Sequence, residues 1–457
     1  MKKLTLFLLF AFLIFPPLTF GGAPKSSPSD AATQAVLDQA IETDLDYLTD
    51  LYKYFHRNPE LHDQESKTGA RMASEMRTAG FDVHEPIGGH GHVGVLKNGE
   101  GPVLLLRTVM DALPIEEETG LPYASTTTAL GTDSKEVPVS HVCGHDAMMV
   151  SSIGAIRYLA ANKNRWRGTV TLVAQPADES LLGARTMIRN GLVNAIAKPD
   201  YVIGYHLLPT FASNQVAWVP GHVTAGAETA EVTVRGIPGH GSFPADAKDP
   251  IPLAAHIILA YQTMLTREIP PLDTASLNIG YIHAGQEVNA IPAEVKMGVT
   301  IRFYSNSVRD KLVAGIRRIA ENQARAYGIP EDRLPVVKFL PTGIGSAYND
   351  HALTAKVVAG FKRVIDPENI VETTKLLGAD ETSAFANAWD KPLPMMFYFY
   401  GSTAPEALKA AEKGGPVIPS LHTPGFAPDL RPTLTTGTKS LVGAVLGLLG
   451  NANSEGL

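Results

Sequence analysis

Short apolar runs that alternate with helical segments constrain the fold of this chain more than any other feature. Residues 103–108, 169–175 and 201–206 are almost wholly apolar, and residues 146–161 and 184–190 between them have helical periodicity. Strands that are apolar on both faces are typical of a parallel sheet covered by helices on each side. The sequence therefore predicts an α/β domain built around a buried, mainly parallel sheet.

The pattern changes near residue 226, where alternation and amphipathic helices replace the unbroken apolar runs. Strands are expected at residues 229–236, 276–282, 295–304 and 334–340, with helices at 250–265 and 308–327. This β-α-β-β-α-β order is a recognised unit with a one-sided antiparallel sheet. We interpret it as an inserted domain over residues 226–341, which divides the first domain into residues 30–225 and 342–457. A length of 457 residues fits two domains.

The first residues have the pattern of an export signal. Lys2 and Lys3 precede an apolar run over residues 4–15, which Pro16 and Pro17 end. We expect a signal peptide over residues 1–23 and a periplasmic or secreted protein, with an uncleaved membrane anchor as the alternative. A single cysteine excludes an internal disulfide. A net charge of −7 without a long basic run gives no reason to expect nucleic acid or a stable membrane partner.

The strongest local motif is the hexapeptide from His141 to Asp146. Cys143 and His145 are two residues apart where a loop meets a predicted helix, so both side chains can reach one metal ion. The amino end of a helix also favours a thiolate over a thiol. The alternative for this motif alone is a buried free cysteine between hydrogen-bonded histidines.

Further metal-competent residues follow the predicted strands. Asp111, Asp178, Glu179 and His206 come at or after the ends of three successive strands, where ligands bind in open α/β sheets. Any one of them could be a loop carboxylate or a helix cap, but their joint placement favours a site. In the pair Asp178-Glu179, one carboxylate can bind metal while its neighbour accepts a proton from water. His422 is a weaker candidate from the C-terminal part.

The ordered motifs together resemble the metallo-aminoacylase and carboxypeptidase family. The nearest branch contains hippurate hydrolase, N-acyl-L-amino-acid hydrolases and plant auxin-conjugate hydrolases. The resemblance covers nearly the whole chain after the signal. Its motifs are His56 to Leu61, Met110 to Pro114, His141 to Asp146, Gln175 to Glu179, Gly239 to Gly241, Asn289 to Pro292 and Leu421 to Pro424.

The resemblance implies a metallopeptidase-like catalytic domain with a ferredoxin-like inserted lid and two divalent metal ions per chain. The implied ligands are Cys143 as the bridge, His145, Glu179, His206 and His422. Asp178 falls on the general base, and Asp111 is a structural residue near the site. His240, Asn289 and Arg302 in the lid fall near substrate-contacting positions, and the fork of Arg302 suits a carboxylate. Zinc or manganese is expected, and cobalt or nickel also tolerates such ligands.

The implied function is a metal-dependent amidohydrolase that cleaves N-acyl amino acids or similar small amides. One alternative is a carboxypeptidase or dipeptidase acting on short peptides. Another is a degenerate member that binds metal and a carboxylate without turnover, because the chain departs from the family pattern. Asp178 stands where the family usually has Glu, and Val109, Met148, Ala245 and Ala427 replace family residues. The lid is also a candidate surface for a homodimer.

Overall fold

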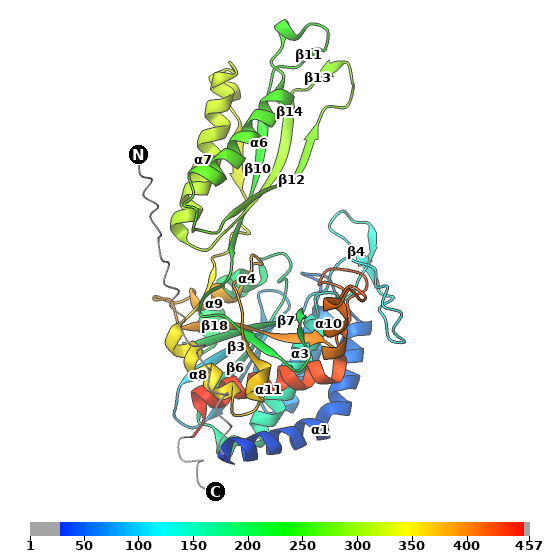
Figure 1. The fold of residues 1–457 in the computed structure, drawn as a ribbon, viewed down its shortest axis with the longest axis vertical. Helices are drawn as coiled ribbons and strands as arrows, with labels where there is room; N and C mark the ends of the chain where they lie inside the picture. Colours follow the sequence, from blue (N-terminus) through cyan, green and yellow to red (C-terminus); the bar gives the residue numbers. More distant parts are fainter. Residues whose placement is uncertain (1–27, 452–457) are drawn as a thin grey trace, which may run out of the picture.

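The computed structural model describes residues 28–451, whose main features are a large sheet and a second, smaller one, with three two-stranded sheets besides (Figure 1). The large sheet has eight strands in the order β1-β2-β6-β3-β7-β18-β8-β17. Its central strands β6 (Gly168–Gln175), β3 (Val103–Val109), β7 (Tyr201–Ala212) and β18 (Met395–Thr403) are parallel to one another. The antiparallel neighbours are β1 (Asp82–Ile87), β2 (Gly91–Asn98) and β8 (Val216–Trp218), while β17 (Ile370–Glu372) pairs parallel with β8. The predicted mainly parallel α/β fold is confirmed.

Helices cover both faces of this sheet, which explains why its strands are apolar throughout. In β3, Leu104 and Leu106 belong to one hydrophobic core, whereas Leu105 between them belongs to the other. The first core is completed by α1 (Pro28–Arg57), α2 (Ser66–Thr78), α3 (His145–Ala161), α8 (His351–Phe361) and α11 (Leu430–Leu449). The second core is completed by α4 (Gly183–Arg189), α5 (Leu192–Ala195) and α9 (Thr382–Ala386).

The second sheet is antiparallel and projects away from the large one (Figure 1). Its order is β12 (Ser276–Ala284), β14 (Glu294–Phe303), β10 (Gly226–Arg235) and β15 (Val336–Phe339). Helices α6 (Pro250–Arg267) and α7 (Asn306–Ala326) contribute to its separate hydrophobic core. Each helix has an amino-terminal cap, because Asp249 and Ser305 accept hydrogen bonds from Ile251 N and Val308 N. The element order is the expected β-α-β-β-α-β, while the domain boundaries stay a prediction.

Strand β7 is longer than the sequence suggested. His206 was expected to end the strand, but pairing with β18 continues through Leu207, Leu208 and Ala212. The apolar residues after His206 extend the parallel ladder beyond the point where the first polar side chain occurs. His206 therefore projects from within a strand, opposite Phe399.

The remaining elements are short. They are β4 (Thr128–Leu130), β5 (Glu136–Pro138), β9 (Gly221–Thr224), β11 (Gly239–His240), β13 (Ala290–Ile291), β16 (Ala347–Asn349) and α10 (Pro405–Glu412), with one-turn 3-10 helices at 163–165, 244–246, 331–333 and 367–369. The expected signal peptide lies outside the described residues, so export stays a prediction. Between residues 28 and 451, no helix combines the length and the apolar character needed to cross a membrane.

Candidate metal centre

The loop before α3 sets the position of Cys143 and His145. Gly144 caps the helix in the left-handed conformation, with φ of 76°. A side chain at this position would place Cβ 2.5 Å from Leu207 Cδ2 and would strain the left-handed backbone, so the contact and the conformation both favour glycine. His145 then begins the helix with no exposed surface, and Cys143 is 6% exposed. The motif thus presents both side chains toward the carboxyl ends of the parallel strands.

Two groups of possible ligands share the Cys143 sulfur. Cys143 lies with His145 and His206 in one group and with Glu179 and His422 in the other, and in each group the donor atoms are within 4.8 Å of one another. The Cys143 Sγ atom is 3.5 Å from His206 Nε2 and 3.2 Å from His422 Nε2. The structure therefore brings together all five residues that the resemblance implied as ligands, with Cys143 between the two groups.

Two of the histidines are hydrogen-bonded through Nδ1, which leaves Nε2 of each ring available to bind a cation. His145 Nδ1 lies 2.8 Å from the Asp111 carbonyl oxygen, and His206 Nδ1 lies 2.6 Å from that of Leu207. Each Nδ1 must donate to its carbonyl, so it is Nε2 that would offer its lone pair to a cation when the ring is neutral. His145 Nε2 is buried without a hydrogen-bond partner among residues 28–451. One thiolate, three imidazoles and one carboxylate suit borderline divalent ions such as zinc.

Asp111 organises the cluster without belonging to either group. Its Oδ2 accepts a hydrogen bond from Glu179 N at 2.8 Å, and its Oδ1 lies 3.3 Å from His145 Nδ1. The side chain has no exposed surface. Asp111 therefore links the backbone of one predicted ligand to the ring of another.

The local electrostatics favour the deprotonated forms of the acidic groups. Burial alone would raise the pKa of the Cys143 thiol, but His145 and His206 lower it to about 6. Burial also opposes ionisation of Glu179, yet hydrogen bonding to His422 and the charge of His145 lower its pKa to about 2. A thiolate and a carboxylate are the forms that bind a metal cation.

Asp178 belongs to a buried network that sequence reasoning missed. Arg107 has no exposed surface and donates hydrogen bonds to Asp178 Oδ1, to Asp380 Oδ2 at 2.7 Å and to Gln175 Oε1 at 2.9 Å. The other oxygen of Asp178 lies 3.9 Å from His145 Nε2. Burial raises the pKa of Asp178 to about 6, with Asp380 adding to the increase and Arg107 opposing it. The network fixes one carboxylate oxygen and directs the other toward the cluster.

A cavity of about 520 Å³ opens in front of the cluster. Cys143, Asp178, Glu179, His206 and His422 line it together with Arg302, and Leu208, Phe397, Phe399 and Leu421 add apolar surface. Arg302 lies on β14 and has a buried Nη1 without a hydrogen-bond partner in the described part of the chain. The inserted sheet thus contributes an unpaired cation to the cavity.

The other two predicted substrate contacts lie elsewhere. His240 on β11 and Asn289 beside β13 are exposed. Figure 1 shows β11 and β13 at the end of the second sheet that is farthest from the large sheet. Neither residue lines the cavity in front of Cys143. The structure therefore brings Arg302 to the cluster but not His240 or Asn289, whose predicted contacts stay untested.

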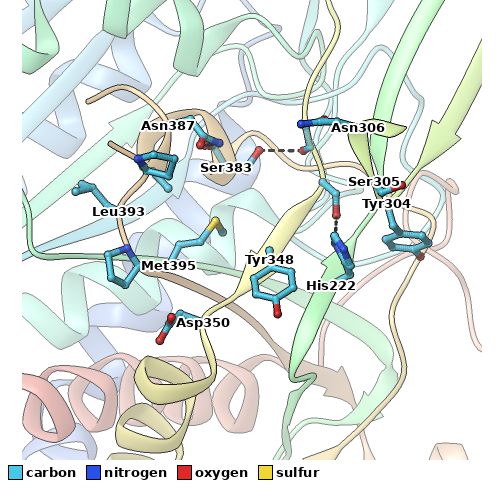
Figure 2. Close-up of a pocket in the computed structure, with 15 residues that line it drawn as sticks. His222, Tyr304, Ser305, Asn306, Tyr348, Asp350, Ser383, Asn387, Leu393 and Met395 are labelled. Carbon is cyan, nitrogen blue, oxygen red and sulfur yellow. Dashed lines mark hydrogen bonds between the residues drawn. The ribbon is translucent and has the colours of Figure 1, made fainter. Parts of the chain in front are cut away.

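A second cavity of about 540 Å³ lies where the two sheets join (Figure 2). His222, Tyr304 and Tyr348 provide its aromatic surface, and His222 Nδ1 is 2.8 Å from Ser346 Oγ. None of its lining residues belongs to either group of possible metal ligands. The cavity that contains Cys143 is therefore the stronger candidate for chemistry.

Together, the parallel sheet, the cluster around Cys143 and the inserted antiparallel sheet define an α/β protein with a candidate metal centre. The family model described as Peptidase family M20/M25/M40 matches residues 105–413. The chain belongs to that family, which confirms the resemblance carried by the motifs.

Named relatives cover most of the chain. Thermostable carboxypeptidase 2 of Saccharolobus solfataricus is 31% identical over 84% of this chain and 91% of its own length. Hippurate hydrolase of Campylobacter jejuni is 36% identical over 60% of this chain and 69% of its own. The Bacillus subtilis YXEP protein, described as a dinuclear metal binding peptidase, superposes with a TM-score of 0.71 at 24% identity over 89% of this chain and 99% of its own. This last likeness supports the fold.

Proposed function

We propose that this protein is a metal-dependent amidohydrolase that cleaves the amide bond of N-acyl amino acids. The observation that carries the proposal is the pair of ligand groups sharing Cys143 at a cavity with an unpaired arginine. Cys143, His145, Glu179, His206 and His422 would hold two divalent ions, with zinc or manganese as the proposed metals. Relatives named as a hippurate hydrolase and an N-acetyl-L-cysteine deacetylase support this substrate class.

The chain's own residues divide the remaining work. Bound ions would supply Lewis-acid activation of water and of the amide carbonyl. Asp178 accepts the proton of the attacking water at Oδ2, the oxygen that faces His145, and passes it to the leaving nitrogen. Arg107 holds Oδ1 and so keeps this carboxylate in one orientation. Glu179 cannot take this part while its carboxylate serves as a ligand.

The cavity also suggests how the substrate lies. Arg302 would pair with the carboxylate of the amino acid, because its buried Nη1 has no other acceptor among residues 28–451. The acyl group would then lie against the apolar surface made by Leu208, Phe397 and Phe399. A cavity of about 520 Å³ matches a small-molecule substrate better than a folded protein.

A substrate panel tests the proposal and separates it from its alternatives. The purified protein, with its metal content measured, would be incubated with hippurate, N-acetyl amino acids and dipeptides. We expect hydrolysis of the acyl amino acids. Faster cleavage of peptides would favour a carboxypeptidase, a reading that the named carboxypeptidase relative supports. Two bound metals without turnover of any compound would favour the degenerate, non-catalytic member.

Replacing Arg302 with alanine should selectively impair substrates that carry a free carboxylate. Loss of a buried charged hydrogen bond costs about 2–4 kcal/mol in transition-state stabilisation, or roughly 30- to 1000-fold in kcat/KM. Amidated analogues should lose little. Arg235→Ala is the matched control, because Arg235 is also in the inserted sheet but contacts Leu334 O. Equal losses of kcat/KM on free-acid and amidated substrates would show that Arg302 does not bind the substrate carboxylate.

We also propose that two copies pair through β12. Within the described part of the chain, this strand has only β14 as a neighbour, and Tyr281 and Ile282 on it are 42% and 52% exposed. An exposed edge with apolar side chains is a template for pairing with another strand. Native mass measurement should show a dimer that Ile282→Lys converts to a monomer, while Lys296→Glu on the inner strand β14 leaves it intact. A parent protein that is monomeric at micromolar concentration would overturn this proposal.

A further inference from the structure

We infer that Glu65 is a positioning residue that fixes the turn bearing Asp178 and Glu179 through the backbone amide of Ala177. Glu65 precedes α2, more than a hundred residues from that turn in sequence. The inference rests on the proposed function, because it concerns the predicted base and one predicted ligand. It adds a residue that neither contacts the cavity nor belongs to either ligand group.

The turn after β6 has an unusual backbone. Ala177 and Leu181 have φ of 54° and 56°, so two non-glycine residues in the left-handed region lie on either side of Asp178 and Glu179. L-residues with a Cβ adopt this region at a cost, and they remain there only when surrounding contacts hold them. Contacts that restrain Ala177 therefore determine where the next two side chains point.

Glu65 supplies such a contact from outside the turn. Its side chain has no exposed surface, and its Oε1 accepts a hydrogen bond from Ala177 N at 2.7 Å. Burial and the nearby Asp111 raise the pKa of Glu65 to about 8. Its part is that of a hydrogen-bond acceptor, and a glutamine amide oxygen can replace it.

The start of α2 is itself anchored, which makes Glu65 a firm support. Glu60 accepts hydrogen bonds from Thr68 N at 2.7 Å and Lys67 N at 3.2 Å, in the first turn of the helix. The Glu65 carbonyl accepts from Gly69 N at 2.8 Å. On the other side of the turn, Asp111 accepts from Glu179 N. The buried carboxyl groups of Glu65 and Asp111 thus accept hydrogen bonds from the backbone amides of Ala177 and Glu179, the residues on either side of Asp178.

Loss of the Glu65 acceptor should displace Asp178 without changing what lines the cavity. A displacement of about 1 Å can cost on the order of 100-fold in rate. The substrate would still find Arg302 and the apolar surface, so KM should change little. The affinity for metal should also fall, because Glu179 follows Ala177 by two residues in the same turn.

Three substitutions test this inference in the full-length protein. Glu65→Gln keeps the acceptor at the same reach, Glu65→Asp shortens the reach, and Glu65→Met removes the acceptor at similar volume. We would measure kcat and KM at saturating metal and Zn²⁺ affinity by competition with a chromophoric chelator. Glu75→Met is the matched control, because Glu75 is a buried acid on α2, the helix that Glu65 precedes, and it contacts Tyr47 and Arg71 instead of the turn.

We expect kcat of Glu65→Met to fall about 10- to 100-fold with KM within about threefold of the parent, and Zn²⁺ affinity to fall with it. Glu65→Asp should be intermediate, Glu65→Gln close to the parent, and Glu75→Met less stable but unchanged in kcat. If Glu65→Gln is as impaired as Glu65→Met, or if Met and Asp keep parental kcat and Zn²⁺ affinity, the inference is wrong. If the parent protein hydrolyses no amide, the proposed function is wrong. The Zn²⁺ affinities of the variants still test the positioning role of Glu65 in that case.

Discussion

Replacing Asp178 with asparagine is expected to reduce amide hydrolysis by roughly 10²- to 10⁴-fold while the metals stay bound, because a general acid-base group typically contributes that much. The amide side chain keeps the shape and can still accept a hydrogen bond from Arg107, but it cannot take a proton from water. Steady-state kinetics with metal analysis of the same samples checks both halves of the expectation.

Asp380 provides the control for this experiment. It is the other carboxylate on Arg107 and also lines the cavity, so it is the nearest competitor for the part of the base. Asp380→Asn should reduce the rate much less than Asp178→Asn. If Asp380→Asn reduces the rate more than Asp178→Asn, with metals present in both variants, the general base is Asp380.

Asp178→Glu tests whether the length of the side chain at this position limits the rate. Family members usually carry Glu there, and the added methylene extends the carboxylate by about one C–C bond, roughly 1.5 Å. Arg107 holds Asp178 from behind, so the shorter side chain is not free to move forward. We therefore expect Asp178→Glu to be faster than the parent. A slower variant would indicate that the turn at Ala177 already stands further forward in this protein.

The second large effect is expected from Cys143→Ala. Cys143 belongs to both ligand groups, so its removal takes a donor from each site at once. Loss of a residue that only orients a ligand typically costs 10- to 100-fold in metal affinity, and loss of a shared ligand should cost at least on the order of 100-fold. Metal content per chain after gel filtration should fall sharply, and hydrolysis should fall with it.

His141→Asn is the matched control within the same motif. His141 is 2% exposed but belongs to neither ligand group. This variant should lose some stability through the altered buried side chain and keep its metals. If Cys143→Ala has the parental metal stoichiometry, or if His141→Asn loses metal equally, the bridge is not at Cys143.

The sequence was most informative where one physical signal dominates. Strands β3, β6 and β7 were predicted because both of their faces are buried, which leaves few polar residues in them. Strands β1 and β2 were missed, because polar residues and glycines occur within them and they pair antiparallel at the sheet edge. The end of β7 was placed too early, since burial by β18 cannot be seen in a local pattern.

The residues of the candidate site also differ in how far the sequence could predict them. The five predicted ligands could be named because the ordered motifs that contain them resemble those of the family, whereas His422 by itself is a weak candidate. Arg107, Asp380 and Glu65 act through contacts that span 68 to 273 residues of sequence, and no local pattern reveals such partners. The sequence does contain one indication of Arg107, because it is the charged residue within the apolar run of β3.

The distance along the chain between Cys143 and His422 has a consequence for assembly. These two residues touch across 279 positions, with the whole second sheet inserted between them. An ion held by both would act as a cross-link that closes one very long loop, and its binding energy would add to the folding energy of the large sheet. During synthesis, one ligand group stays incomplete until His422 emerges, so loading with two metals reports that both halves of the split domain have come together.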